Sequence, residues 1–180
     1  MRLFSAPTMA VAAIAVIAAP ATAAGLAVGT KAPTFATRGA VAGKVVTIDL
    51  AQQLKKGPVV LYFFPAAFTG GCNAEAHAFA EAIPEFTKAG ATVIGMSADD
   101  VPTLQKFSAE KCAGKFAVAS AGPAVIRNYD VALNAGGRAL TKRTSYVIGR
   151  DGRVAFVHDD MNPTQHVALT LAAVQKIARS

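Results

Sequence analysis

Cys72 stands where a loop turns into a helix, and this placement is the clearest chemical signal of the chain. The run 58–64 is apolar and rich in β-branched and aromatic residues, which predicts a buried strand. The loop 65–71 follows it, and the Ala-rich stretch after Cys72 predicts a helix. The first turn of a helix offers unpaired N–H groups and the positive end of the dipole, which favour a thiolate over a thiol. Cys72 is therefore a candidate nucleophile.

The residues around Cys72 exclude two other kinds of thiol site. A thiol–disulfide oxidoreductase with this arrangement needs a second cysteine three residues away, and Thr69 and Glu75 occupy those positions. A copper site of the Cys-x-x-x-Cys kind is absent for the same reason, because positions 68 and 76 hold Phe and Ala. Cys72 is the only thiol of its loop.

The apolar patterns predict the elements that position this cysteine. Strands are expected at 45–50, 59–64, 91–98, 116–119, 144–148 and 153–157, and helices at 72–89, 101–112, 123–129 and from Pro163 onward, with a turn at 55–58. Pro84 falls inside the first helix and should kink or split it. The order of these elements predicts an α/β fold, with a central mixed sheet and helices on both faces, and a thioredoxin-like topology fits it.

The N-terminus predicts export from the cytoplasm. Arg2 precedes an apolar run at 9–19, and Ala21 and Ala23 supply the small residues of a cleavage site, so residues 1–23 are expected to be a signal peptide and 24–180 one domain. An uncleaved anchor is the alternative, since 3–30 carries no charge, but Pro20 argues against it. Export implies a periplasmic location or its equivalent.

Charge and composition exclude several other functions. The formal net charge is +7, but the basic residues are scattered and never run longer than two, which does not indicate nucleic-acid binding. The three histidines, His77, His158 and His166, show no ligand spacing and are interpreted as solvated residues. No motif for a metal or an organic cofactor is present.

The pattern Pro65-x-x-x-Thr69-x-x-Cys72 resembles the active-site loop of the peroxiredoxins. As in that family, the motif follows a Val-Val-Leu-Tyr-Phe-Phe strand, and Glu75 stands three residues after the cysteine. Arg143 begins the segment Arg-Thr-Ser-Tyr-Val-Ile, which resembles the strand that carries the family's active-site arginine. The resemblance runs from about residue 29 to the C-terminus and points to the bacterioferritin-comigratory, or Q-type, subfamily.

The resemblance implies a thiol peroxidase with the thioredoxin-like fold in its peroxiredoxin variant. Cys72 would attack the O–O bond and become a sulfenic acid, while Arg143 would donate to the leaving oxygen. Thr69 would donate to the sulfur or the peroxide, and Pro65 would cover the pocket. The expected substrates are hydrogen peroxide and alkyl hydroperoxides, the expected partner is a thioredoxin-like reductant, and a monomer or weak dimer is expected, with no stable membrane association after cleavage.

The role of Cys112 depends on the version of the Q-type cycle. Many members place a resolving cysteine five residues after the first, where this chain has His77. Others resolve from the following helix, and Cys112 is expected in the last turn of the 101–112 helix, on the flank of its apolar face. The resemblance thus implies that Cys112 resolves Cys72 through an intramolecular disulfide, after local unwinding at Cys72. A static disulfide and an inert thiol remain as alternatives.

Two other functions remain open at this point. A non-catalytic redox sensor on the same fold would keep the reactive cysteine but turn over slowly. A thiol–disulfide oxidoreductase is disfavoured, because the second cysteine of its motif is missing.

Overall fold

A computed structural model describes residues 25–179, and the predicted signal peptide lies outside the described residues. The strands are β1 (Ala36–Val41), β2 (Lys44–Asp49), β3 (Val59–Phe63), β4 (Thr92–Ser97), β5 (Ala117–Ser120), β6 (Ala132–Ala135), β7 (Arg138–Thr141), β8 (Thr144–Ile148) and β9 (Val154–Asp159). The helices are α1 (Leu50–Lys56), α2 (Gly70–Lys88), α3 (Val101–Glu110), α4 (Pro123–Asn128) and α5 (His166–Ile177), with a 3₁₀ turn, η1 (Pro163–Gln165), before the last.

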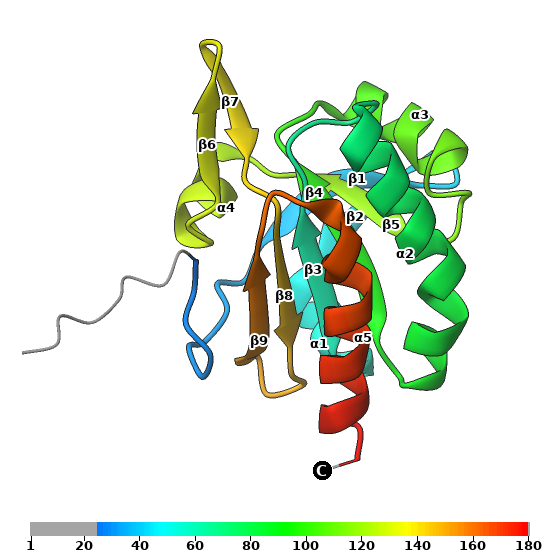
Figure 1. Cartoon of the computed structure of the whole chain (residues 1–180), viewed down its shortest axis with the longest axis vertical. Coiled ribbons are helices and arrows are strands. Elements are labelled where there is room, and N and C mark those ends of the chain that lie inside the picture. Colours follow the sequence, from blue (N-terminus) through cyan, green and yellow to red (C-terminus); the bar gives the residue numbers. More distant parts are fainter. Residues whose placement is uncertain (1–24, 180) are drawn as a thin grey trace, which may run out of the picture.

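Seven strands form one mixed sheet in the order β2-β1-β5-β4-β3-β8-β9 (Figure 1). The central strands β3, β4 and β5 run parallel, while β1, β8 and β9 pair antiparallel with their neighbours. The remaining two strands, β6 and β7, form a separate hairpin that rises from one end of the molecule in Figure 1. The mixed sheet predicted from the sequence is confirmed.

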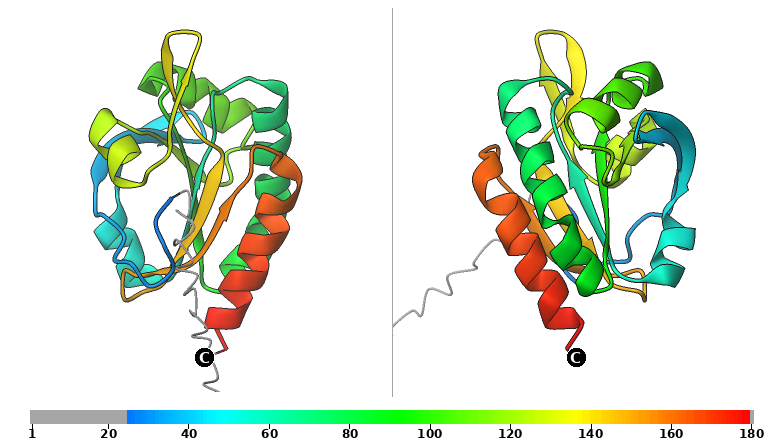
Figure 2. Two further views of the ribbon diagram at one scale, coloured as in Figure 1. Left: turned by 60° about the vertical axis from the view of Figure 1, so that its left-hand side comes forward. Right: turned by 90° about the vertical axis from the view of Figure 1, so that its right-hand side faces the viewer.

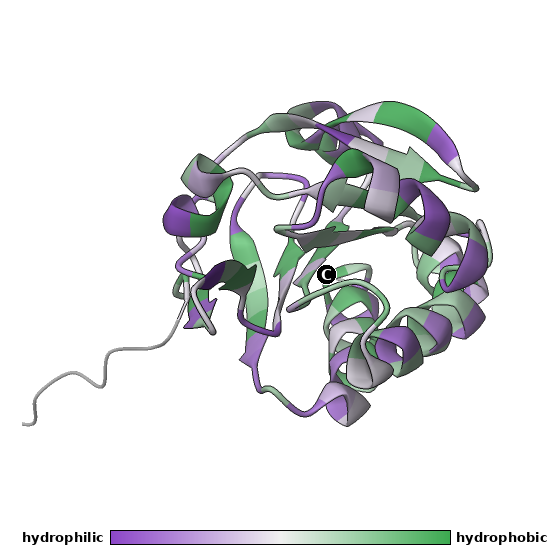
Figure 3. Ribbon diagram, turned by 90° about the horizontal axis from the view of Figure 1, so that it is seen from above, coloured by the Kyte–Doolittle hydropathy of each residue, from purple (hydrophilic) through white to green (hydrophobic). Residues whose placement is uncertain are grey.

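The side chains of β3 alternate between two hydrophobic layers. Val59, Leu61 and Phe63 join a cluster that includes residues of α1 and α4, and the residues between them join a second cluster with residues of α2, α3 and α5. Figure 2 shows α2 and α5 side by side on one face of the sheet, and Figure 3 shows hydrophobic strands between helices of mixed hydropathy. Helices therefore cover both faces, as predicted, and burial on both sides explains the continuous apolar run of β3.

The structure contains three elements that the sequence patterns did not indicate. Residues 50–56, expected to lead into a turn, form helix α1, which buries Leu50 and Leu54 and is capped by Asp49, whose side chain accepts from the N–H of Gln52. Strand β1 and the β6–β7 hairpin also lack a clear pattern, because their residues are small or largely exposed. These strands gain their order from pairing with neighbouring strands in the sheet or the hairpin, whereas α1 is held by its buried leucines and its cap.

Pro84 was expected to kink or split helix α2, which starts at Gly70 and continues through Pro84 to Lys88, so the predicted split is wrong. Pro84 lies on the exposed side of the helix. On the other side, Phe79, Ala80 and Phe86 are buried. This burial outweighs the local cost of the proline and holds the helix together.

Helix α3 ends at Glu110, so Cys112 does not lie in its last turn. The chain leaves the helix through Ala113 and Gly114, which take left-handed φ values of 49° and 67°. The N–H of Cys112 bonds back to the carbonyl of Phe107 at 3.2 Å, and the thiol turns into the core with no exposed surface. The expected position on the flank of the helix is corrected accordingly.

No helix among the residues that the structure describes is both long enough and apolar enough to span a membrane.

Candidate active site

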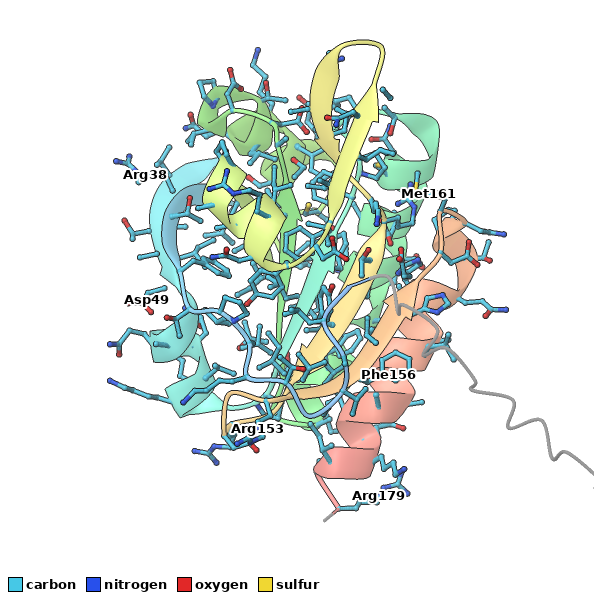
Figure 4. All side chains as sticks on the ribbon, turned by 90° about the vertical axis from the view of Figure 1, so that its left-hand side faces the viewer. Arg38, Asp49, Arg153, Phe156, Met161 and Arg179 are labelled. Carbon is cyan, nitrogen blue, oxygen red and sulfur yellow. The ribbon has the colours of Figure 1, made fainter. Side chains whose placement is uncertain are left out.

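The register of the sheet gathers four segments at one edge. Phe63, at the end of β3, pairs with Met96 of β4 and with Thr144, at the start of β8. The loop after β3, the residues after β4 and the residue before β8 therefore meet where the parallel strands end. Met161, from the turn after β9, lies toward this end of the molecule, and Arg179 lies at the other (Figure 4).

Cys72 occupies the first turn of α2 and is almost fully buried. The first helical bond of α2 joins the N–H of Asn73 to the carbonyl of Thr69, so the N–H groups of Gly71 and Cys72 have no intrahelical acceptor. Such groups at a helix start form a site for an anion or a polarised oxygen. The thiol therefore lies beside backbone donors.

Arg143 binds three groups through its guanidinium and has only 4% of its surface exposed. Nη2 donates to the Cys72 sulfur over 3.5 Å, and Nε donates to the carbonyl oxygen of Met161 over 2.9 Å. Nη1 forms an ion pair with Oε2 of Glu75. A planar guanidinium engaged at three nitrogens has one orientation, which directs its positive charge at the sulfur.

Glu75 supports Arg143 from one turn along α2. Its side chain is buried, and this burial raises the pKa of the carboxyl group to about 7, although the neighbouring Arg143 acts in the opposite direction. Oε2 accepts a hydrogen bond from Nη1 of Arg143, while Oε1 is buried and has no hydrogen-bond partner among the described residues.

His166 lies behind Glu75 and is fully buried, so its interpretation as a solvated residue is wrong. Its Nδ1 is 2.8 Å from the hydroxyl of Ser145 and 3.8 Å from Oε1 of Glu75, and its Nε2 is 2.8 Å from the carbonyl oxygen of Asp160. Burial lowers the pKa of the imidazole to about 4. A sequence signal existed: positions 166, 170 and 174 form one row of α5, and all three are buried.

The structure places Thr69 and Pro65 in the loop before Cys72, but neither forms a hydrogen bond with the sulfur. Thr69 precedes α2, is exposed, and donates its hydroxyl to the carbonyl of Ala66 over 3.0 Å. Pro65 is half-buried directly after Phe64 at the end of the strand. Both residues belong to the loop that leads from β3 to Cys72.

Asp99 holds this loop, a role that the sequence did not indicate. Its Oδ2 accepts from the N–H of Ala67 over 2.7 Å and from the hydroxyl of Ser97 over 2.8 Å. The next loop residue, Phe68, has a left-handed φ of 65°, and its ring packs edge-on against Phe107 of α3. The loop is thus fixed by a carboxylate on one side and an aromatic contact on the other.

Cys112 lies in the same core cluster as Cys72, and both thiols are free. Burial raises the pKa of the Cys112 thiol to about 12, so it is a protonated thiol in this conformation. His77, which takes the place of a nearer cysteine, is 69% exposed and lies 3.2 Å from Glu81, as expected for a solvated helix residue. Among residues 25–179, no three His, Cys, Asp or Glu side chains form a metal site.

Comparisons with known proteins agree on one family. The sequence profile of the AhpC/TSA family matches residues 28–157. The chloroplastic peroxiredoxin Q of Oryza sativa subsp. japonica is 32% identical over 150 residues, which cover 83% of this chain and 67% of that protein.

Two solved structures are similar in sequence as well as in fold. The peroxidoxin BcpB of Mycobacterium tuberculosis has a TM-score of 0.74 and 30% identity, covering 83% of this chain and 97% of that one. The bacterioferritin comigratory protein of Xanthomonas campestris, described for its alkyl peroxide reduction activity, has a TM-score of 0.68 and 28% identity, covering 78% and 91%. The family match spans most of the described residues, and the fold and the thiol at a helix start agree with it. The chain therefore belongs to the AhpC/TSA family and is a thiol peroxidase similar to the peroxiredoxin Q proteins.

Proposed function

We propose that this protein reduces hydrogen peroxide and alkyl hydroperoxides through a sulfenic acid on Cys72. The observation that carries the proposal is the 3.5 Å contact between Nη2 of Arg143 and the Cys72 sulfur. In the reaction, the thiolate attacks one peroxide oxygen, an S–O bond forms and the O–O bond breaks. The leaving oxygen keeps the electron pair and takes a proton to become water or an alcohol. Alkyl peroxide reduction is also the activity given for the Xanthomonas campestris protein.

The donors around the sulfur are suited to the charge that develops in this step. Arg143 and the N–H groups of Gly71 and Cys72 can donate hydrogen bonds to the leaving oxygen as it gains negative charge. Pro65 would cover the pocket, and Thr69 would turn its hydroxyl from the Ala66 carbonyl toward the bound peroxide.

Cys112 would complete the cycle as the resolving cysteine. Its sulfur attacks the sulfenic sulfur of Cys72, an S–S bond forms and water leaves. A thioredoxin-like dithiol would then reduce the disulfide. Cys112 is buried and protonated in this conformation, so the attack requires a local opening, and Gly70 and Gly71 lower the cost of unwinding the start of α2.

The test is mass spectrometry before and after one equivalent of peroxide. A Cys72–Cys112 linked peptide in a digest made without reductant supports the full cycle. Sulfinic Cys72 together with free Cys112 would remove the resolving role but keep the peroxidatic one. Peroxide consumption by Cys72→Ser at the rate of the wild type would refute the function. Cys112→Ser is the matched control, since it should still be oxidised once at Cys72.

The same mass spectra test export. We propose export because residues 1–23 have the pattern of a signal peptide. Protein purified from a host that exports it should begin at residue 24 or 25, and cell fractionation should place it in the periplasm. A monomer or weak dimer is the proposed state, and sedimentation of the reduced protein tests it.

A redox sensor is the second candidate, and the burial of Cys112 favours it. If the opening that exposes Cys112 is slow, the oxidised protein persists and can pass its oxidation to a partner. Steady-state turnover with an added thioredoxin separates the two candidates. Many turnovers per minute identify a peroxidase, and oxidation without turnover identifies a sensor.

A further inference from the structure

The hydrogen bonds of His166 determine which of its nitrogens carries the proton. Nε2 lies 2.8 Å from the carbonyl oxygen of Asp160, and a carbonyl oxygen only accepts, so Nε2 is the protonated nitrogen. In a neutral imidazole Nδ1 is then an acceptor, and it receives the hydroxyl of Ser145 over 2.8 Å. The ring is held at both ends and has one orientation.

The imidazole ring of His166, fixed in this orientation, lies next to the Glu75 carboxyl group. Nδ1 lies 3.8 Å from Oε1, the oxygen that has no hydrogen-bond partner, and both side chains are fully buried. The ring of His158 packs against the imidazole in a T-shaped arrangement, with ring centroids 4.5 Å apart, which further restricts the movement of His166. The carboxyl group is therefore confined, and its other oxygen stays on Nη1 of Arg143.

We propose that His166 is a positioning residue of the peroxide site, which confines Glu75 and thereby directs the Arg143 guanidinium at the Cys72 sulfur. The inference rests on the proposed function, since it assigns His166 a part in the same site. It differs from a packing role in one respect. If His166 acts through Glu75 and Arg143, its loss must lower the reactivity of the Cys72 sulfur, which a simple loss of core packing need not do.

Two substitutions test the two nitrogens of the His166 imidazole independently. His166→Asn keeps a polar atom near the Nδ1 position, against Glu75 and Ser145, whereas His166→Gln keeps one near the Nε2 position, against Asp160. We expect His166→Gln to slow the alkylation of Cys72 by iodoacetamide and to slow its reaction with peroxide about tenfold, which corresponds to about 1.4 kcal/mol. His166→Asn should retain more of both properties.

Thr170→Val is the matched control for packing. Thr170 is buried one turn along α5 and donates its hydroxyl to the carbonyl of His166 over 2.6 Å, but it forms no hydrogen bond with Glu75. This variant should lose stability and keep the alkylation and peroxide rates of the wild type. Ser145→Ala, which removes only the hydroxyl on Nδ1, should slow both reactions as His166→Gln does, but less. It keeps the test valid if a His166 variant fails to fold.

A double-mutant cycle tests whether the effect passes through Glu75. The effects of His166→Gln and Glu75→Gln on the alkylation rate of Cys72 should not add, because both act on one carboxyl group. Additive effects, or rates equal to those of the wild type in all His166 and Ser145 variants, would overturn the positioning role. If the wild type itself fails to react with peroxide, the proposed function fails instead, and the alkylation rate still decides the role of His166.

Discussion

Nη2 of Arg143 lies 3.5 Å from the sulfur of Cys72, although the two residues are 71 positions apart in the chain. The antiparallel pairing of β3 with β8 brings them together, because it sets Thr144 opposite Phe63. The arginine is held in place by the carbonyl of Met161 and the carboxylate of Glu75. A buried cation in a fixed orientation is thus placed next to the only thiol at a helix start.

Arg143→Lys should lower the rate of Cys72 oxidation at least tenfold, although it keeps the positive charge. An ammonium group is a point charge and cannot reach Glu75, Met161 and the sulfur at once. The loss should appear in kcat/KM, measured by competition with a second peroxidase. Arg127→Lys, a change at an exposed arginine, is the control. Equal rates for Arg143→Lys and the wild type would show that charge alone suffices.

Asp99→Ala and Asp100→Ala should have different effects, although the two residues are neighbours. Asp99 holds the active-site loop at Ala67, so its loss should cost about 1–3 kcal/mol of stability and also slow the reaction with peroxide. Asp100 caps α3 through the N–H of Thr103, so its loss should cost about 1 kcal/mol and leave the rate unchanged. Urea unfolding and single-turnover rates measure both effects, and a slower Asp100→Ala reaction would contradict the assignment.

Glu75 and His166 should oppose each other in the pH dependence of stability. Burial raises the pKa of Glu75 from 4.5 to about 7, so the folded protein binds more protons than the unfolded chain, and this contribution is lost as the pH rises through 7. Burial lowers the pKa of His166 from 6.5 to about 4, so its contribution is present above pH 6.5 and is lost as the pH falls through 4. Between about pH 4.5 and 6.5, the free energy of unfolding therefore falls with rising pH because of Glu75 and rises because of His166.

Removing either residue should therefore expose the slope of the other. As the pH rises from about 4 to 6.5, the free energy of unfolding of Glu75→Gln should increase by up to about 3 kcal/mol. As the pH rises from about 4.5 to 7, that of His166→Asn should decrease by a similar amount. The wild type should be nearly flat between about pH 4.5 and 6.5. Urea unfolding across this range is the measurement, and parallel curves for the three proteins would show that neither group titrates as described.

Phe68→Ala should speed the second chemical step without speeding the first. The Phe68 ring packs against Phe107, whose carbonyl accepts from the N–H of Cys112, so this contact joins the active-site loop to the turn that carries the second thiol. Its loss should favour the opening that lets Cys112 reach Cys72. Sub-denaturing urea should act in the same direction on the wild type.

Rapid quenching and thiol mapping would follow the sulfenic acid and the disulfide separately. Val28→Ala changes another exposed apolar residue and serves as the control. A disulfide step that neither Phe68→Ala nor urea accelerates would argue against a local opening as the limiting event.

The local patterns of the chain predicted the strand, loop and helix around Cys72, the central mixed sheet and the helices on both faces. These features depend on hydrophobic periodicity and on capping residues, which can be recognised from residues that are close together in the sequence. The same reasoning placed Cys112 in the last turn of a helix and predicted that Pro84 would kink or split α2, which is not split. Both errors arise because burial against the rest of the protein, and not local preference, decides where a helix continues and where a turn folds inward.

Only the tertiary structure decided which distant residues meet Cys72. The sequence alone pointed to Cys72 as the nucleophile, and resemblance supplied Arg143. Strand register and helix packing then surrounded them with Glu75, His166 and Asp99, of which His166 had been interpreted as solvated. A periodic pattern specifies which face of an element is buried, but it carries no information on which other buried side chain that face will contact. That pairing follows from the order and register of the sheet.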